Sequence, residues 1–165
     1  MIGLMGADPV EAARAMPLLN QLCRRVEHCG PVGAGATMKL AINLPLMIYW
    51  QALGEALALL RPLGLDPARI IELLADSSGG ANVLKVRGPA LVKLIKGEQP
   101  GPAMFTLDNG IKDLRLMLAE GASRGVDMPL VAGTLACFEE ASRQGLGATE
   151  AAGMSVYWST RQGGK

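Results

Sequence analysis

The stretch that decides the fold is residues 30–43, GPVGAGATMKLAIN. Its glycine- and proline-rich first half predicts a bend, and its second half begins a helix. Apolar residues recur at helical spacing from Ala36 to about Pro62, so we predict one long helix that ends before Leu63-Gly64. Pro45 lies inside this helix and removes one backbone hydrogen bond, which predicts a kink at a cost of about 3 kcal/mol.

Residues 1–30 have a different pattern. An apolar run covers Met1 to Met5, and Asp8-Pro9 then supplies a helix N-cap followed by a proline in the first turn. A helical segment to about Cys23 precedes a short predicted strand over residues 24–28. One strand–helix–strand unit is too small to form a stable sheet by itself. We therefore expect residues 1–30 to be the remnant of a larger α/β domain.

The remainder of the chain, residues 31–165, is predicted to be all helical. Asp66-Pro67 opens a helix by the same logic as Asp8-Pro9, and Thr106 or Asp108 caps another that ends at Gly125. The fold class that we predict is mainly α, a helical domain built on one long helix and preceded by a short βαβ remnant. The further helices are expected over residues 67–75, 82–86, 89–96, 108–124, 129–144 and 150–160, with a loop over 97–102 and a frayed tail over 162–165.

Composition narrows the classes of function. Half of the residues are hydrophobic but only 4% are aromatic, and the formal net charge is +1, so nothing indicates a nucleic-acid partner or an anionic membrane surface. The longest apolar runs are too short to span a bilayer, and no secretory leader is evident, so we expect a cytoplasmic protein. Cys23, His28 and Cys29 lack the second pair of ligands that zinc sites need, so no metal is expected.

Lys39 and Asn43 are the candidate reactive pair. Being four residues apart, they share one helix face, and the glycines before them can receive an anion or the edge of a cofactor. A lysine ammonium beside an amide can hold a substrate oxygen and give it a proton as hydride arrives. A solvated surface pair remains the alternative. Neither a P-loop nor a dinucleotide fingerprint is complete in this stretch, since Ala36-Thr37 and Met38 occupy the positions that would have to match.

The glycine bend and the Lys39…Asn43 pair resemble the catalytic segment of the β-hydroxyacid dehydrogenases, which include 3-hydroxyisobutyrate dehydrogenase and, more distantly, 6-phosphogluconate dehydrogenase. The resemblance covers nearly the whole chain, and the order and spacing of its motifs make it specific. Pro45 and Ile111 depart from the usual pattern. The later matching segments are Glu55-Ala56, residues 63–67, residues 77–79, Phe105, residues 112–114 and residues 125–129.

The resemblance implies a role for each matching position. Lys39 would be the catalytic acid/base, and Asn43, with Gly35 in the bend, would bind the substrate. Lys112 would contact the cofactor across an interdomain cleft, with Asp113 beside it holding that turn of the helix on the cofactor side.

The resemblance also implies the cofactor and the partners. NAD or NADP would be bound mainly by an N-terminal domain, of which residues 1–30 would be the last strand–helix–strand. The substrate would be a short 3-hydroxy acid or its semialdehyde, and the helical domain, residues 31–165, would form a homodimer or tetramer. These 165 residues alone, which lack the pyrophosphate-binding glycines, are expected to be inactive.

Two other hypotheses stay open at this point. The chain could be a helical oligomerisation or binding module derived from the same family that has lost catalysis. It could also be a relative of the imine reductases, although Lys39 counts against that reading because those enzymes generally lack a lysine at the matching position.

Overall fold

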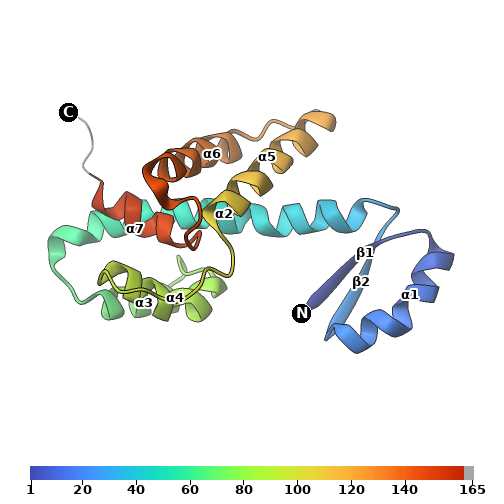
Figure 1. The fold of residues 1–165 in the computed structure, drawn as a ribbon, viewed down its shortest axis with the longest axis horizontal. Coiled ribbons are helices and arrows are strands. Elements are labelled where there is room, and N and C mark those ends of the chain that lie inside the picture. The colour runs from blue at the N-terminus through green and yellow to red at the C-terminus, as the bar shows by residue number, and fades with distance from the viewer. Residues whose placement is uncertain (162–165) are drawn as a thin grey trace.

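The structure, a computed structural model, describes residues 1–161. One long helix, α2 (Ala34–Leu60), connects the two parts of the molecule (Figure 1). A small α/β unit lies at its N-terminal end, and a helical body packs around the rest of it. The prediction for residues 162–165 lies outside the described residues. The other elements are β1 (Ile2–Gly6), α1 (Pro9–Leu22), β2 (Arg25–Gly30), a 3₁₀ turn (Arg61–Leu63), α3 (Pro67–Asp76), α4 (Asn82–Ile95), α5 (Leu107–Ser123), α6 (Pro129–Ala141), a π-helical segment (Ser142–Leu146) and α7 (Gly153–Thr160).

The predicted strand–helix–strand over residues 1–30 is present. β1 and β2 pair in parallel, from Ile2 opposite Arg25 to Met5 opposite His28, and α1 makes the crossover. The Asp8 carboxylate caps α1 by accepting from the Val10 N–H at 2.9 Å, as the sequence indicates. The described sheet has two strands only, so each strand keeps one unpaired edge.

The mainly α class is confirmed, and α2 is the long helix on which the body is built. α5, α6 and α7 pack against α2, while α3 and α4 pack against each other and reach the body through α7 (Figure 1). α2 continues through Pro45 to Leu60 as one helix. α2 and α7 pack closely, because Gly54 has no room for a side chain and the buried Ser155 hydroxyl donates to the Trp50 carbonyl at 2.6 Å.

One predicted boundary is wrong. The two short helices expected over residues 82–86 and 89–96 are a single helix, α4, which runs through Gly88-Pro89. Gly88 is buried and faces α3, where a Cβ would lie 2.8 Å from Ile71, so this glycine serves helix packing and does not end the helix. Pro89 lies on the exposed side, where water can bond the carbonyl that loses its helical donor.

Helix lengths also bear on membrane insertion. Within residues 1–161, every helix is either too short or insufficiently apolar to cross a bilayer.

Candidate active site

Three side chains from α2 and α5 meet at one carboxylate. The Lys39 ammonium and the Asn43 amide, one turn apart on α2, both donate to Oδ2 of Asp113 on α5, with Asn43 Nδ2 at 3.2 Å. Asp113 is 3% exposed, whereas the Lys39 side chain is 46% exposed. The buried negative charge therefore has a direct counter-ion whose outer half remains open to solvent or a ligand.

Local sequence explains how these side chains come to face each other. The Thr106 side chain caps α5 by accepting from the Asn109 N–H at 3.2 Å, which starts the helix at Leu107. Apolar residues on the core face of α5 include the buried Ile111 and Leu114, and Asp113 lies at the edge of that face. Packing of α5 on α2 thus directs the Asp113 carboxylate at the Lys39–Asn43 face.

This arrangement is suited to proton transfer at an oxygen atom. One N–H of Lys39 is engaged by Asp113, which orients the amine and leaves its other protons available. Asn43 donates one N–H to Asp113, and within residues 1–161 its side-chain carbonyl oxygen accepts no hydrogen bond from another side chain. The half-exposed ammonium and a partly free amide can therefore hold a small oxygen-containing substrate.

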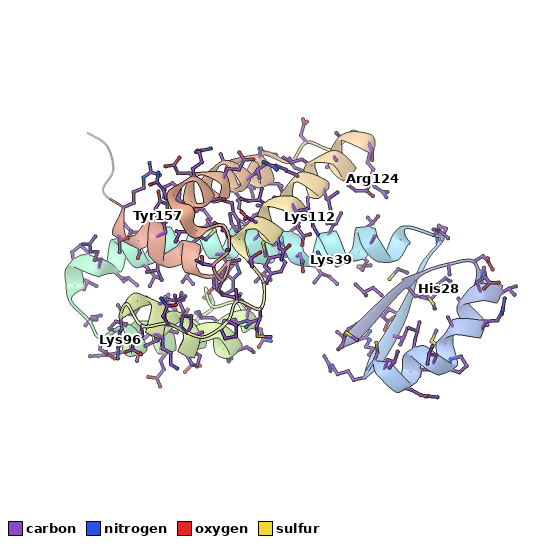
Figure 2. All side chains as sticks on the ribbon, in the orientation of Figure 1. His28, Lys39, Lys96, Lys112, Arg124 and Tyr157 are labelled. Carbon is purple, nitrogen blue, oxygen red and sulfur yellow. The ribbon has the colours of Figure 1, made fainter. Side chains whose placement is uncertain are left out.

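Lys112 lies on a different side of α5 from Asp113. Its side chain is exposed and lines an open groove of about 590 Å³ between α5 and α6, together with Asp108, Arg115 and Glu139. In Figure 2, Lys112 is labelled on α5 and Lys39 on α2. No bond joins Lys112 to Lys39, Asn43 or Asp113 in the described residues. Its expected contact with a cofactor stays a prediction.

Gly35 has a packing role that the sequence did not reveal. It is buried in the first turn of α2, and a Cβ there would lie 2.6 Å from the Leu4 carbonyl oxygen of β1. The absence of a side chain lets α2 start directly against the sheet. Gly33, the residue before the helix, has φ = 96°, which favours glycine. The substrate contact expected of Gly35 is not tested by this geometry.

The bonds of Asp113 to α2 were not predicted from the sequence. The resemblance implied that Asp113 holds a turn of its own helix on the cofactor side, and that role stays a prediction; in the structure its buried carboxylate bonds to α2. The sequence could not show this, because Lys39 and Asp113 are 74 positions apart. Direct contact between Asp113 and a cofactor is a prediction that the structure leaves untested.

A second polar contact between α2 and α5 was missed from the sequence. Glu120 Oε1 accepts from the Thr37 hydroxyl at 2.8 Å and from Arg124 Nε at 2.9 Å. The Arg124 guanidinium and then the Thr37 hydroxyl hold the pKa of the Glu120 carboxyl below its usual value. The four-residue spacing of Glu120 and Arg124 was a visible signal for their ion pair, but nothing in the sequence connected either residue to Thr37.

The side chains considered as metal ligands, and the third cysteine, Cys137, lie outside this site. His28 Nε2 lies 2.8 Å from the Ala7 carbonyl oxygen, and Cys23, Cys29 and Cys137 are free thiols. Burial, with a contribution from Glu55, raises the pKa of the Cys137 thiol. Within residues 1–161 no group of three or more histidine, cysteine or acidic side chains is arranged to hold a metal ion.

The fold and the site together define a helical domain that holds a lysine–amide pair against a buried carboxylate and carries an α/β unit at its N-terminal end. This is the class expected for the C-terminal part of a two-domain hydroxyacid dehydrogenase. Residues 33–157 match the family described as NAD-binding of NADP-dependent 3-hydroxyisobutyrate dehydrogenase, and the chain belongs to this family. The expected family resemblance is thereby confirmed, and the expectation of NAD or NADP agrees with the family description.

Named relatives are similar over most of this chain. Glyoxylate/succinic semialdehyde reductase 1 of Arabidopsis thaliana is 31% identical over 147 residues, which are 89% of this chain and 49% of the relative. 2-(Hydroxymethyl)glutarate dehydrogenase of Eubacterium barkeri is 28% identical over 160 residues, 97% of this chain and 52% of the relative. The chain thus spans about half the length of the curated relatives it matches.

Solved structures share the fold. A 3-hydroxyisobutyrate dehydrogenase from Salmonella typhimurium superposes with a TM-score of 0.78 at 22% identity, covering 91% of this chain and 51% of that one. The Mycobacterium tuberculosis 3-hydroxyisobutyrate dehydrogenase, solved with L-serine, also has a TM-score of 0.78 at 22% identity and covers 93% of this chain and 53% of that one.

Proposed function

We propose that this chain supplies the acid/base half of an NAD(P)-dependent oxidoreductase that acts on a short hydroxy acid or the corresponding aldehyde. The observation that carries the proposal is the Lys39 ammonium, half exposed and held with Asn43 on the buried Asp113 carboxylate. The names of the relatives support the substrate class, because they describe reductases of glyoxylate and succinic semialdehyde and dehydrogenases of hydroxy acids.

Lys39 acts on the substrate oxygen in this proposal. In the direction of reduction, the ammonium gives its proton to the oxygen as the carbonyl becomes a hydroxyl, and the neutral amine regains a proton from solvent. In the direction of oxidation, the neutral amine takes the hydroxyl proton. Asn43 holds the substrate beside Lys39. Asp113 directs the Lys39 amine toward the substrate and balances its charge. General acid/base catalysis requires the proton-transferring group to be positioned in this way.

The residues present fit the nicotinamide end of NAD(P) only. The exposed Met38 and Ile42 lie beside Lys39 on α2, so apolar surface is available near the proton-transfer group, and Lys112 is an exposed cation on α5. The sequence contains no complete glycine fingerprint for the pyrophosphate. When bound, the cofactor would accept or deliver the hydride, and Lys112 would contact it.

Residues 1–30 are proposed to be the last strand–helix–strand of a nucleotide-binding domain, and residues 31–165 a catalytic and dimerisation domain. The two-stranded parallel sheet with unpaired edges supports the first assignment. Exposed apolar side chains on α1, among them Val10, Leu18 and Leu22, support it as well, because they form a surface that a larger domain would cover. A homodimer or tetramer formed through the helices, in the cytoplasm, completes the proposal.

Turnover by the protein made from its complete open reading frame tests this function. Glyoxylate, succinic semialdehyde and 3-hydroxyisobutyrate are assayed with NAD(H) and NADP(H) in both directions. Loss of a positioned acid/base group lowers rates by about 10²–10⁴-fold, which is the decrease expected in kcat for Lys39→Ala. Lys85→Ala is the matched control, because Lys85 is an exposed lysine on α4 that pairs with Asp76. The activity of this variant should equal that of the wild type.

Two results would count against the proposal. Full activity of Lys39→Ala would show that Lys39 takes no part in the reaction. Absence of turnover with every substrate and either cofactor would favour the non-catalytic helical module. A calorimetric titration of the 165-residue chain adds a separate check, since micromolar affinity for NAD(H) or NADP(H) would contradict the expectation that these residues alone do not form the cofactor site.

A further inference from the structure

In the described residues, two groups of polar contacts join α2 to α5, one at Asp113 and one at Glu120, and they start from nearly opposite sides of α2. Thr37 and Lys39 are two residues apart, so their side chains point about 160° apart around the helix. Leu40 and Leu44 fall in the angle between them and face α5. Lys39 bonds to Asp113 on one side of α2, and Thr37 bonds to Glu120 on the other side.

The two carboxylates occupy one face of α5. Asp113 and Glu120 are seven residues apart, which places them about two turns from each other along the helix on nearly the same side. Arg124 closes the outer contact by donating to Glu120 Oε1 through Nε at 2.9 Å and Nη2 at 2.6 Å, and its Nη2 lies 3.5 Å from the Thr37 hydroxyl. Figure 2 places Arg124 at the end of α5 that extends toward the N-terminal part of α2.

Apolar packing beside the Thr37–Glu120 contact is incomplete. Leu40, Leu44, Met117 and Gly121, together with Thr37, Glu120 and Arg124, line a half-open pocket of about 130 Å³ between α2 and α5. A seam with unfilled volume resists rotation of a helix about its own axis less than a filled one does, because contacts are missing on one side. On this side of α2 the contact of Thr37 with Glu120 and Arg124 therefore restrains the rotation of the helix.

The Lys39–Asp113 contact cannot fix the rotation of α2 alone if Lys39 takes part in the reaction. The attraction between Lys39 and Asp113 depends on the charge of the amine, which changes when the proton moves to a substrate. Glu120, Arg124 and Thr37 do not exchange protons with the substrate. The low pKa of the Glu120 carboxyl, caused first by Arg124, keeps that contact ionised throughout the neutral range.

We propose that Thr37, Glu120 and Arg124 are positioning residues that fix the rotation of α2 and thereby keep Lys39 directed at its substrate. The inference rests on the proposed function for the role of Lys39. The first turns of α2 are held to α5 by this network whether or not the amine of Lys39 carries its proton, so the acid/base group returns to the same place after each transfer.

Thr37→Val tests the network with little change in shape, because it replaces the hydroxyl by a methyl group. Thr37→Ser keeps the hydroxyl and should restore the wild-type behaviour. The Thr37 hydroxyl also lies 3.4 Å from the Gly33 carbonyl oxygen, so Glu120→Ala is the second variant, which removes the contact to α5 and leaves Thr37 intact. Glu140→Gln is the control, since Glu140 pairs with Arg143 at 2.7 Å, away from α2.

Hydrogen exchange of the amides of residues 36–42 in the 165-residue chain is the first measurement. We expect exchange there to be about 5- to 10-fold faster in Thr37→Val and Glu120→Ala, and unchanged in Thr37→Ser and Glu140→Gln, because loss of the contact lowers the free energy of local opening. Exchange in α3 and α4 should not change in any variant. Unchanged exchange over residues 36–42 in Thr37→Val and Glu120→Ala would overturn the proposal.

Steady-state kinetics of the active protein are the second measurement. Thr37→Val and Glu120→Ala should lower kcat about 3- to 10-fold with KM changed less than about twofold, since a displaced acid/base group slows the chemical step more than binding. Recovery in Thr37→Ser distinguishes positioning from general loss of stability. Equal kcat in Thr37→Val and wild type would overturn the positioning role, whereas full activity of Lys39→Ala would overturn the proposed function itself.

Discussion

Removal of the Lys39 ammonium should destabilise the protein more than removal of the Asp113 charge does. Lys39→Met keeps most of the aliphatic chain but leaves a carboxylate that is 3% exposed with only Asn43, at 3.2 Å, as a donor. Asp113→Asn instead leaves a lysine that is 46% exposed and can be hydrated. The asymmetry follows from burial, because an uncompensated buried charge costs far more than an exposed one.

The magnitude follows from the same exposures. A hydrogen bond to a charged group contributes about 1.5–3 kcal/mol, and screening of the half-exposed ammonium lowers this to about 1–2 kcal/mol for Lys39→Met. We expect Asp113→Asn to cost about 0.5–1 kcal/mol, since the amide can still accept one bond. The coupling free energy of the double-mutant cycle should be about 1 kcal/mol.

Urea unfolding followed by circular dichroism at the helical band measures all four members of the cycle. The Glu11–Arg14 pair on α1 is the control cycle, because its side chains are 58% and 74% exposed and its coupling should stay below about 0.5 kcal/mol. The reasoning is refuted if the Lys39–Asp113 coupling is no larger than that of the control. It is also refuted if Asp113→Asn is the more destabilising single substitution.

Two further predictions concern stability. Gly54→Ala should destabilise the protein by about 2–4 kcal/mol, because a Cβ at Gly54 would lie 2.9 Å from Trp158 Cβ and 3.0 Å from the Ser155 carbonyl oxygen. Gly133→Ala on α6, where the space is open, should stabilise it by about 0.5–1 kcal/mol. Thermal unfolding measures both variants, and a milder effect at Gly54 would show that α7 can move away. The pKa of the Glu120 carboxyl in the folded state lies below its ordinary value of 4.5. The stability that the ionised carboxyl contributes is therefore present above pH 4.5 and is lost as the pH falls through the folded-state pKa. Glu120→Gln should flatten the dependence of the unfolding free energy on pH below about 4.5, and parallel curves for the variant and the wild type would contradict this prediction.

Much of the fold could be predicted from local patterns. Asp8-Pro9 and Asp66-Pro67 marked two helix starts correctly, since an N-cap side chain acts within its own first turn. Gly88-Pro89 misled the prediction because the same residues that end helices also permit close packing, and only the neighbouring Ile71 on α3 shows which role applies. A helix boundary can be predicted from the sequence when residues of that helix determine it. It cannot be predicted when packing against a neighbouring helix determines it.

The site divides in the same way. Helical spacing alone placed Lys39 and Asn43 on one face, because a residue and its fourth neighbour are always one turn apart. No spacing rule connects that face to Asp113, 74 positions later, or Thr37 to Glu120, 83 positions later. Those partners depend on how α5 crosses α2, and the crossing is decided by side-chain packing along the whole seam.

The sequence by itself determined the mainly α class, the long helix α2, the α/β unit at the N-terminus, the family and the lysine–asparagine pair. Each of these depends on residues close together in the chain or on the order of several motifs along it. Only the tertiary structure decided that Asp113 turns inward to the pair and that Glu120 holds the start of α2. The physical reason is that a buried carboxylate takes its partner from whichever helix packs over it, and that helix is known only once the chain has folded.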